Sequence, residues 1–235
     1  MTPRDRARQG IAASAPNKAA MATISPADHS ARGTRDQSRE VARIAAFSDG
    51  VFAIAITLLA LQLDIPSGSW VDVWAELGKL GSSFISFAIS FAVIGAYWVA
   101  HHRLFSLVER YDRRLIWLNL LSLFFIVVMP FTTSLVAEHG SQNASVIVYA
   151  LCVAAAGFTN TGMAAYALIG HRLCASDVDD DMVNYNIWRG LVIALVFSIS
   201  LALLPLGTTV VELSWISLAV FQRIVRHRFA HAGEV

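Results

Sequence analysis

One acidic residue, Asp49, lies beside a long apolar stretch of the sequence. It follows Phe47 and Ser48 and precedes the run VFAIAITLLALQL, which begins at Val51. An ionised carboxylate in such surroundings needs a polar partner. Arg43 lies six residues earlier, about 240° away around a helix, so we expect the partners of Asp49 on other segments.

Candidate partners stand at the ends of two further apolar runs. Trp98, His101 and His102 end one run, and Asn119 opens the next. We predict that they form a hydrogen-bonded cluster that ties helix ends together, in preference to ion ligation or catalysis. Adjacent histidines are about 100° apart on a helix, whereas two that share a metal ion typically stand four residues apart. We therefore expect no metal site.

The elements that position these residues are membrane-spanning helices. Of the 235 residues, 56% are hydrophobic and 15% are charged, a balance that suits lipid better than water. Apolar runs long enough to cross a bilayer occur at about 45–63, 82–102, 115–137, 145–169, 187–206 and 208–224. The sequence predicts an all-α polytopic membrane protein with six transmembrane helices, the last two separated by a turn near Pro205.

Basic residues concentrate in alternate connections. The connections that carry few of them, around 64–79, 138–144 and 206, fall on the other side of the bilayer. Because basic loops stay in the cytoplasm, we predict a cell-membrane protein with both termini cytoplasmic. The expected parts are a disordered tail over 1–38, a transmembrane domain over 39–228 and a short tail over 229–235. The basic residues are Arg32, Arg35, Arg39, Arg43, Arg103, Arg110, Arg113, Arg114, Arg172, Arg223, Arg226 and Arg228.

Polar loops give two further predictions. Asp177, Asp179, Asp180 and Asp181 precede the fifth helix, where an acidic residue favours helix capping over cation attraction. Trp70 and Trp74, four residues apart, are typical of the membrane surface.

The first helix carries an apolar stripe. Ile54, Leu58 and Leu61 recur at i, i+4 and i+7, with Thr57 beside them. From the residues alone, such a stripe in a membrane helix favours a packing face over a pore lining.

Three segments of the sequence carry a resemblance to a known family. The run RIAAFSDGVFAIAITLL, from Arg43 to Leu59, resembles the RxxxFSD first-helix motif of the transmembrane protein 175 family of potassium channels. YWVAHHRLF (Tyr97 to Phe105) and RRLIWLNLLSLFFIVVMPF (Arg113 to Phe131) look like the second and third helices of its bacterial members.

The resemblance implies a homotetramer with a central pore lined by the first helices and no re-entrant selectivity filter. By the same resemblance, Ile54 forms the narrowest point, Leu58 and Leu61 form further pore layers, and Thr57 is linked to selectivity. Phe47, Ser48 and Asp49 then hold the pore helix through contacts with Arg43 and with the second and third helices. Rings of apolar residues gate by dewetting. With such rings, the preference for potassium over sodium depends only on the cost of dehydrating the ion and on the pore width, so we expect it to be modest.

Two other classes of function stay open at this point. A proton- or cation-coupled secondary transporter would use Asp49 and a nearby histidine, although no internal repeat or broken helix is evident. A membrane enzyme would need more His, Asp or Glu residues at one depth than the helices offer. The expected partners are the lipid bilayer and further copies of the chain, and no cofactor is expected beyond permeant potassium. The net charge of only +1 gives no indication of nucleic-acid binding.

Overall fold

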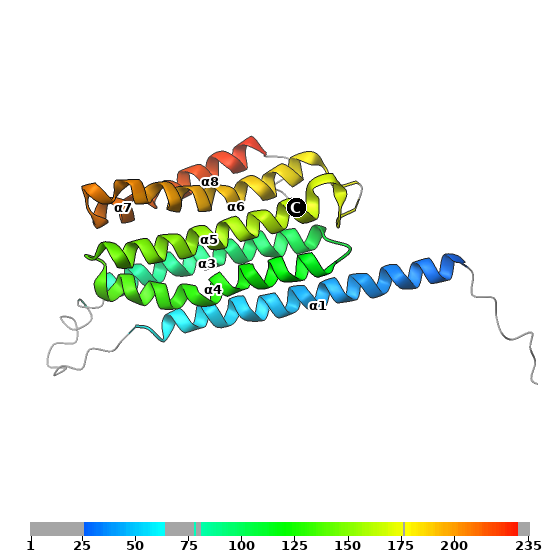
Figure 1. Cartoon of the computed structure of the whole chain (residues 1–235), viewed down its shortest axis with the longest axis horizontal. Helices are drawn as coiled ribbons and strands as arrows, with labels where there is room; N and C mark the ends of the chain where they lie inside the picture. The colour runs from blue at the N-terminus through cyan, green and yellow to red at the C-terminus, as the bar shows by residue number, and fades with distance from the viewer. Residues whose placement is uncertain (1–25, 64–77, 79–80, 176, 230–235) are drawn as a thin grey trace, which may run out of the picture. The chain divides into compact units, whose positions relative to one another are not determined.

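Within the unit 37–235, the described helices run roughly alongside one another (Figure 1). The computed structural model describes residues 26–63, 78, 81–175 and 177–229. The helices are α1 (Pro26–Ala60), α3 (Gly81–Leu107), α4 (Arg113–His139), α5 (Asn143–Leu168), η2 (Ile169–His171), α6 (Asp180–Ser200), η3 (Leu201–Leu206), α7 (Thr208–Ser214) and α8 (Ser217–Arg228). Residues 1–25, 230–235 and the pair Trp70 and Trp74 lie outside the described part, so the predictions about them stay predictions.

Within the described residues, six helical segments are long and apolar enough to span a membrane, which confirms the prediction of a six-helix membrane protein. They are Arg35–Ala60, Ser83–Leu107, Arg113–His139, Asn143–His171, Asp180–Leu206 and Thr208–Arg228.

The helices differ from the prediction in several details. Helix α1 begins at Pro26, within the stretch over 1–38 that we expected to be disordered, and proline is well accepted in the first turn of a helix. The sixth span is interrupted at Trp215 and Ile216, between α7 and α8.

The predicted turn between the fifth and sixth spans is confirmed. Helix α6 continues into the 3-10 helix η3, which contains Pro205, and the chain then turns at Gly207. Gly207 has a φ of 109°, a backbone conformation that residues with a side chain rarely adopt. A glycine at this position therefore allows α7 to fold back along α6.

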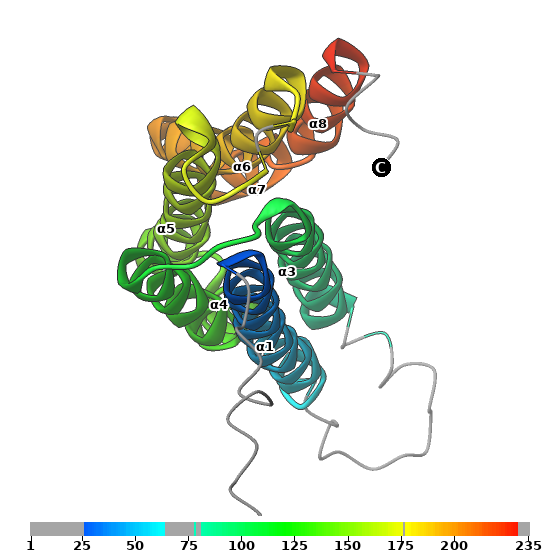
Figure 2. The same cartoon turned by 90° about the vertical axis from the view of Figure 1, so that its right-hand side faces the viewer.

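The largest apolar core joins α1 to the bundle. Phe52, Ala55 and Leu59 of α1 are each only 1% exposed and pack with buried residues of α3, α4, α5 and α6. Two views agree that α1 lies beside α3 and α4 (Figure 2). A second core lies around Leu104, Leu115 and Leu168, near the α3–α4 and α5–α6 connections.

The connections α3–α4 and α5–α6 are bound to each other. The backbone amides of Glu109 and Arg110 both donate to the carbonyl oxygen of Leu173, at 2.9 and 3.1 Å. Cys174 is buried and free, and burial raises the pKa of its thiol. Both cysteines of the chain, Cys152 and Cys174, are unpaired, in line with a fold held by packing alone.

Aspartates cap two of the helices. The Asp179 side chain accepts the backbone amide of Asp181 at the start of α6, which confirms the capping prediction. At the start of α4, Asp112 Oδ1 accepts the amide of Leu115 at 2.8 Å, and its other oxygen accepts the hydroxyl of Tyr166 from α5. Asp112 therefore caps the start of α4 and also links α4 to α5.

The Asp112 carboxylate should stabilise the fold only above about pH 4. Burial tends to raise its pKa, but hydrogen bonds from Tyr166, Leu115 and Arg114, together with the charge of Arg114, hold the pKa of Asp112 below its usual value. A group whose pKa is lowered by folding stabilises above its unfolded pKa, about 3.9, and loses that contribution as the pH falls. Asp112→Asn, which still caps the helix, should lower the melting temperature at pH 7. The gap to wild type should close as the pH falls below about 4, and a gap that is constant over this range would exclude the charge as its cause.

Candidate functional site

The structure brings several of the predicted polar residues together at the junction of α1, α3 and α4. Asp49 of α1 is half-buried, and its Oδ1 accepts the indole N–H of Trp98 of α3 at 2.9 Å. The carboxylate therefore has a hydrogen-bond partner on another helix.

A second set of hydrogen bonds lies one residue earlier on α1. The buried Ser48 hydroxyl donates to the carbonyl of Ile44 at 2.9 Å and accepts the amide Nδ2 of Asn119 at 3.0 Å. The Asn119 oxygen pairs with Nε2 of His101 at 2.8 Å. Because an amide oxygen can only accept, Nε2 carries the ring proton. Ser48, Asn119 and His101 thus connect three helices through a buried chain of hydrogen bonds.

The His101 ring also packs against two aromatic side chains that the sequence analysis missed. Phe105 is stacked on it with ring centroids 4.5 Å apart, and Phe52 lies at 5.4 Å. Phe105 stands four residues after His101, and this helical spacing was the signal that could have found it. The aromatic neighbours keep the hydrogen bonds of His101 out of water.

Three predicted members stand outside this network. Arg43 is exposed and pairs with Glu40, one turn earlier, at 2.7 Å. His102 is exposed, with its ring centroid 5.6 Å from that of Trp98, and Phe47 is 57% exposed. Residues adjacent on a helix point in different directions, so the pairs Phe47–Ser48 and His101–His102 each divide between surface and interior.

The apolar stripe of α1 lies on the surface of the chain. Ile54 is 61% exposed, Leu58 40% and Leu61 77%, whereas Phe52, Ala55 and Leu59 on the other side of the helix are buried. Thr57 is also exposed, and its hydroxyl donates to the carbonyl of Ile54 at 2.9 Å. The packing face of α1 is therefore the Phe52 side, and the Ile54 side is free to meet something else.

No group of three or more His, Cys, Asp or Glu side chains suited to a metal ion occurs among the residues placed by the structure. The polar cluster consists of two sets of side chains that are already hydrogen-bonded. The Asp49 carboxylate binds the Trp98 indole, and the Ser48 hydroxyl, the Asn119 amide and the His101 ring bind one another. Its geometry suits fixing α1 against α3 and α4.

Comparison with known proteins identifies the family. The family model described as the endosomal/lysosomal potassium channel TMEM175 matches residues 43–130. A protein from Chamaesiphon minutus named as a potassium channel is 38% identical over 154 residues, which cover 63% of this chain and 76% of that protein. The chain belongs to the TMEM175 family. Its membership, and the channel names of its relatives, confirm the prediction that it is not an enzyme.

Other TMEM175 relatives match over shorter stretches. A Streptomyces collinus protein named as a potassium channel is 42% identical over 121 residues, which span 49% of this chain and 59% of that protein. The mouse protein named as the endosomal/lysosomal proton channel TMEM175 is 41% identical over 100 residues, 37% of this chain but only 19% of its own length.

A solved structure supports the fold over most of the chain. The crystal structure of a lysosomal potassium-selective channel TMEM175 homologue from Chamaesiphon minutus superposes with a TM-score of 0.64 and 30% identity. It covers 84% of this chain and all of that one. The last three helices, which carry no motif, therefore share the TMEM175 fold as well.

Replacing the Asp49 carboxylate should loosen α1. Asp49→Ala removes the acceptor of the Trp98 indole and should lower the stability of the folded protein by about 1 kcal/mol, the usual net contribution of one hydrogen bond. Thermal unfolding in detergent, with the fraction of assembled protein followed by gel filtration, measures the loss. Asp49→Asn keeps an oxygen acceptor and should retain most of the stability. Equal losses in the two variants would show that the charge, and not the hydrogen bond, matters.

Proposed function

We propose that this chain forms a potassium-permeable cation channel whose pore is lined by α1. The observation that carries the proposal is the exposed stripe of Ile54, Leu58 and Leu61, on the side of α1 away from its packing face. One chain leaves this stripe on its surface, so several copies must come together to enclose a pore. Four copies around a central axis, the arrangement implied by the resemblance, would place the stripe as three successive apolar rings.

The Ile54 ring acts as the gate in this proposal. Water leaves a narrow apolar constriction readily, and an ion cannot cross until it is wetted. No re-entrant filter is needed, because the cost of dehydration and the pore width set the preference among cations. The Thr57 hydroxyl, whose proton is used on the Ile54 carbonyl, presents oxygen lone pairs next to this ring.

The polar cluster keeps the gate in register. Ser48 and Asp49, bound to α4 and α3, stand about 9 and 7.5 Å from Ile54 along the helix axis at 1.5 Å per residue. A helix fixed so close to its narrowest ring holds the ring side chains toward the axis. Names of the bacterial relatives support the potassium assignment.

The position in the membrane follows from the charges. Arg110, Arg172 and Arg228 lie at the same end of the bundle, since α3 and α5 end there and α8 ends beside the start of α6. By the positive-inside rule we place this end, with both termini, on the cytoplasmic side of the cell membrane.

A potassium flux assay tests the proposal. The purified full-length protein is reconstituted in liposomes loaded with potassium and diluted into sodium, and the compensating proton influx is followed with a dye. We expect dissipation that is faster than in protein-free liposomes, with modest preference for potassium over sodium. Size measurement of the detergent-solubilised protein should give four times the mass of one chain. Absence of flux from such a tetramer, or flux strictly coupled to sodium or protons, would overturn the channel proposal.

A further inference from the structure

Two arginines converge on one buried tyrosine in the second half of the chain. Arg103 of α3 and Arg189 of α6 each donate a hydrogen bond from Nη1 to the hydroxyl of Tyr185, at 3.2 and 3.3 Å. The Arg103 guanidinium also lies 5.6 Å from the centre of the Tyr185 ring. Both arginines are half-buried, within helices that span the membrane.

These guanidinium groups lack a negative partner in the described part of the chain. The ion pair of Arg43 with Glu40 and the contact of His139 with Glu138 involve neither Arg103 nor Arg189. Arg226 of α8 adds a third positive charge that repels Arg189. Each guanidinium has five N–H donors, and the neutral Tyr185 hydroxyl accepts a hydrogen bond from only one donor of each arginine. Positive charges held together at membrane depth are costly unless an anion joins them.

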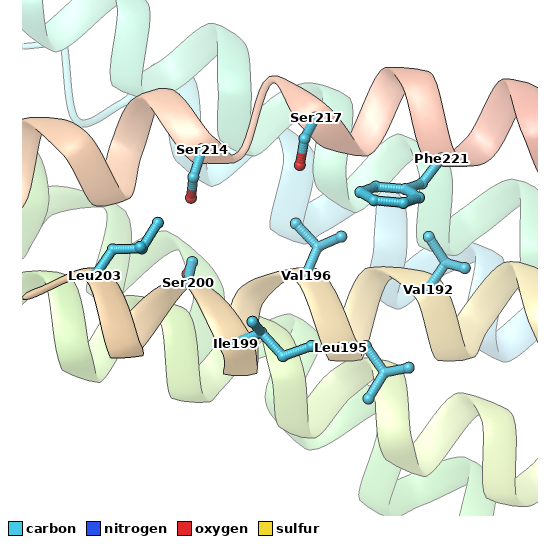
Figure 3. A pocket seen from close by; sticks show the side chains of 9 residues that line it. All are labelled: Val192, Leu195, Val196, Ile199, Ser200, Leu203, Ser214, Ser217 and Phe221. Atoms are coloured by element: carbon cyan, nitrogen blue, oxygen red, sulfur yellow. The ribbon is translucent and has the colours of Figure 1, made fainter.

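An apolar groove begins beside this cluster. It lies between α6 and the α7–α8 pair and has a volume of about 410 Å³. Figure 3 shows Phe221 of α8 above Val192 of α6, and Leu203 of the following η3 turn reaching into the space below Ser214. Nearly all of its lining is hydrocarbon.

The groove and the charged cluster form one continuous surface. Val192, Val196 and Ile199 stand three, seven and ten residues after Arg189, so they share its face of α6. The Gln222 side chain donates to the Arg189 carbonyl at 3.0 Å and holds α8 over this junction. From Val192 to Leu203 the groove extends about 17 Å along the helix, close to half of a hydrocarbon core about 30 Å thick.

We propose that this surface binds one anionic phospholipid. Its phosphate contacts Arg103, Arg189 and Arg226, and one acyl chain fills the groove between α6 and α8. Basic pockets between membrane helices are known to take anionic head groups, and the length of the groove matches the chain of a lipid in one leaflet. Helix α8 contacts the bundle mainly through α6, so a lipid bound between these two helices would hold α8 against α6.

The proposal is tested by lipid binding and does not depend on channel activity. The full-length protein is delipidated in mild detergent and titrated with phosphatidylglycerol or phosphatidylcholine of the same acyl chains, and bound lipid is counted by native mass spectrometry. Wild type should bind one phosphatidylglycerol at least about tenfold more tightly than phosphatidylcholine. Arg189→Gln and Arg103→Gln should each lower that affinity about fivefold to tenfold, in keeping with one lost charge contact.

Two control variants distinguish the proposed site from a diffusely basic surface and from a site for free anions. Arg223→Gln removes an equal charge from the exposed surface of α8 and should leave binding unchanged. Val196→Phe, which fills the groove, should weaken binding of long-chain lipid and leave that of a short-chain phosphatidylglycerol unaffected. If Arg189→Gln does not fold, Arg103→Gln and Val196→Phe still decide the question.

Several outcomes would overturn the proposal. Equal loss in Arg223→Gln would mean diffuse attraction of lipid to a basic surface. Competition by inorganic phosphate at concentrations that match lipid affinity, with no effect of Val196→Phe, would mean a site for free anions. Equal binding of the two lipids by wild type would mean that no specific site exists.

Discussion

Liposomes that contain the Ile54→Asn variant should lose potassium about tenfold faster than liposomes with the same amount of wild-type protein. In the proposed pore, the substitution replaces a ring of four apolar side chains with four amides. Amides hold water, so the constriction is wetted more of the time. A barrier lowered by about 1.4 kcal/mol corresponds to a tenfold increase in rate.

The control for this variant is Ile85→Asn. Ile85 is 60% exposed, nearly the same as Ile54 at 61%, but it belongs to α3. The substitution introduces the same amide on an exposed surface outside the proposed pore lining and should leave the flux unchanged. Both variants are checked for tetramer content before reconstitution. If Ile54→Asn behaves like wild type while it is correctly assembled, Ile54 faces lipid or another helix and the gate must be placed elsewhere.

The Gly157→Ala variant should be strongly destabilised by its one added methyl group. The added Cβ of residue 157 on α5 would lie 2.8 Å from the Cβ of Ala194, 3.0 Å from its backbone nitrogen and 2.9 Å from the Tyr97 hydroxyl. A backbone atom cannot give way, so α5 and α6 must move apart. The Tyr97 hydroxyl would also lose its bond of 2.7 Å to the Val153 carbonyl. We expect a loss of about 2–3 kcal/mol, typical of an overpacked core.

Gly162→Ala is the matched control on the same helix. A Cβ at residue 162 meets nothing within 4 Å among the described residues, so the change should be neutral or stabilise the helix by up to about 1 kcal/mol. Urea or thermal unfolding in detergent compares the two variants with wild type. Similar stability of both variants would show that α5 and α6 can separate without cost.

The contrast between Ser48 and Phe47 shows the limit of sequence reading. The motif places these two residues side by side, but Ser48 is buried in a network and Phe47 is at the surface. Likewise, the spacing of Ile54, Leu58 and Leu61 identified a stripe without deciding whether it packs or faces outward. Either apolar face of a membrane helix is acceptable to lipid, so hydropathy does not separate them.

The cluster at Tyr185 was missed for a related reason. Arg189 is the only charged residue in an apolar segment of the sequence. It forms a cluster only together with Arg103, which is 86 positions earlier and on another helix. Contacts between distant segments leave no periodicity in the sequence. The Asp49–Trp98 and Ser48–Asn119 pairs could be anticipated only as a group, because both sets lie near helix ends of similar depth.

The sequence by itself determined the six spanning helices, the basic end of the bundle and the family motif. Each of these depends on local properties, since insertion of a segment reflects its own apolar length and the charges beside it. Only the tertiary structure decided that Phe52, Ala55 and Leu59 are the buried face of α1, that Arg43 and His102 stand outside the polar network, and that three arginines gather without a counterion among the residues the structure describes. Those features depend on which helices pack together, and packing in lipid is governed by shape and hydrogen bonding between segments that hydropathy treats as equivalent.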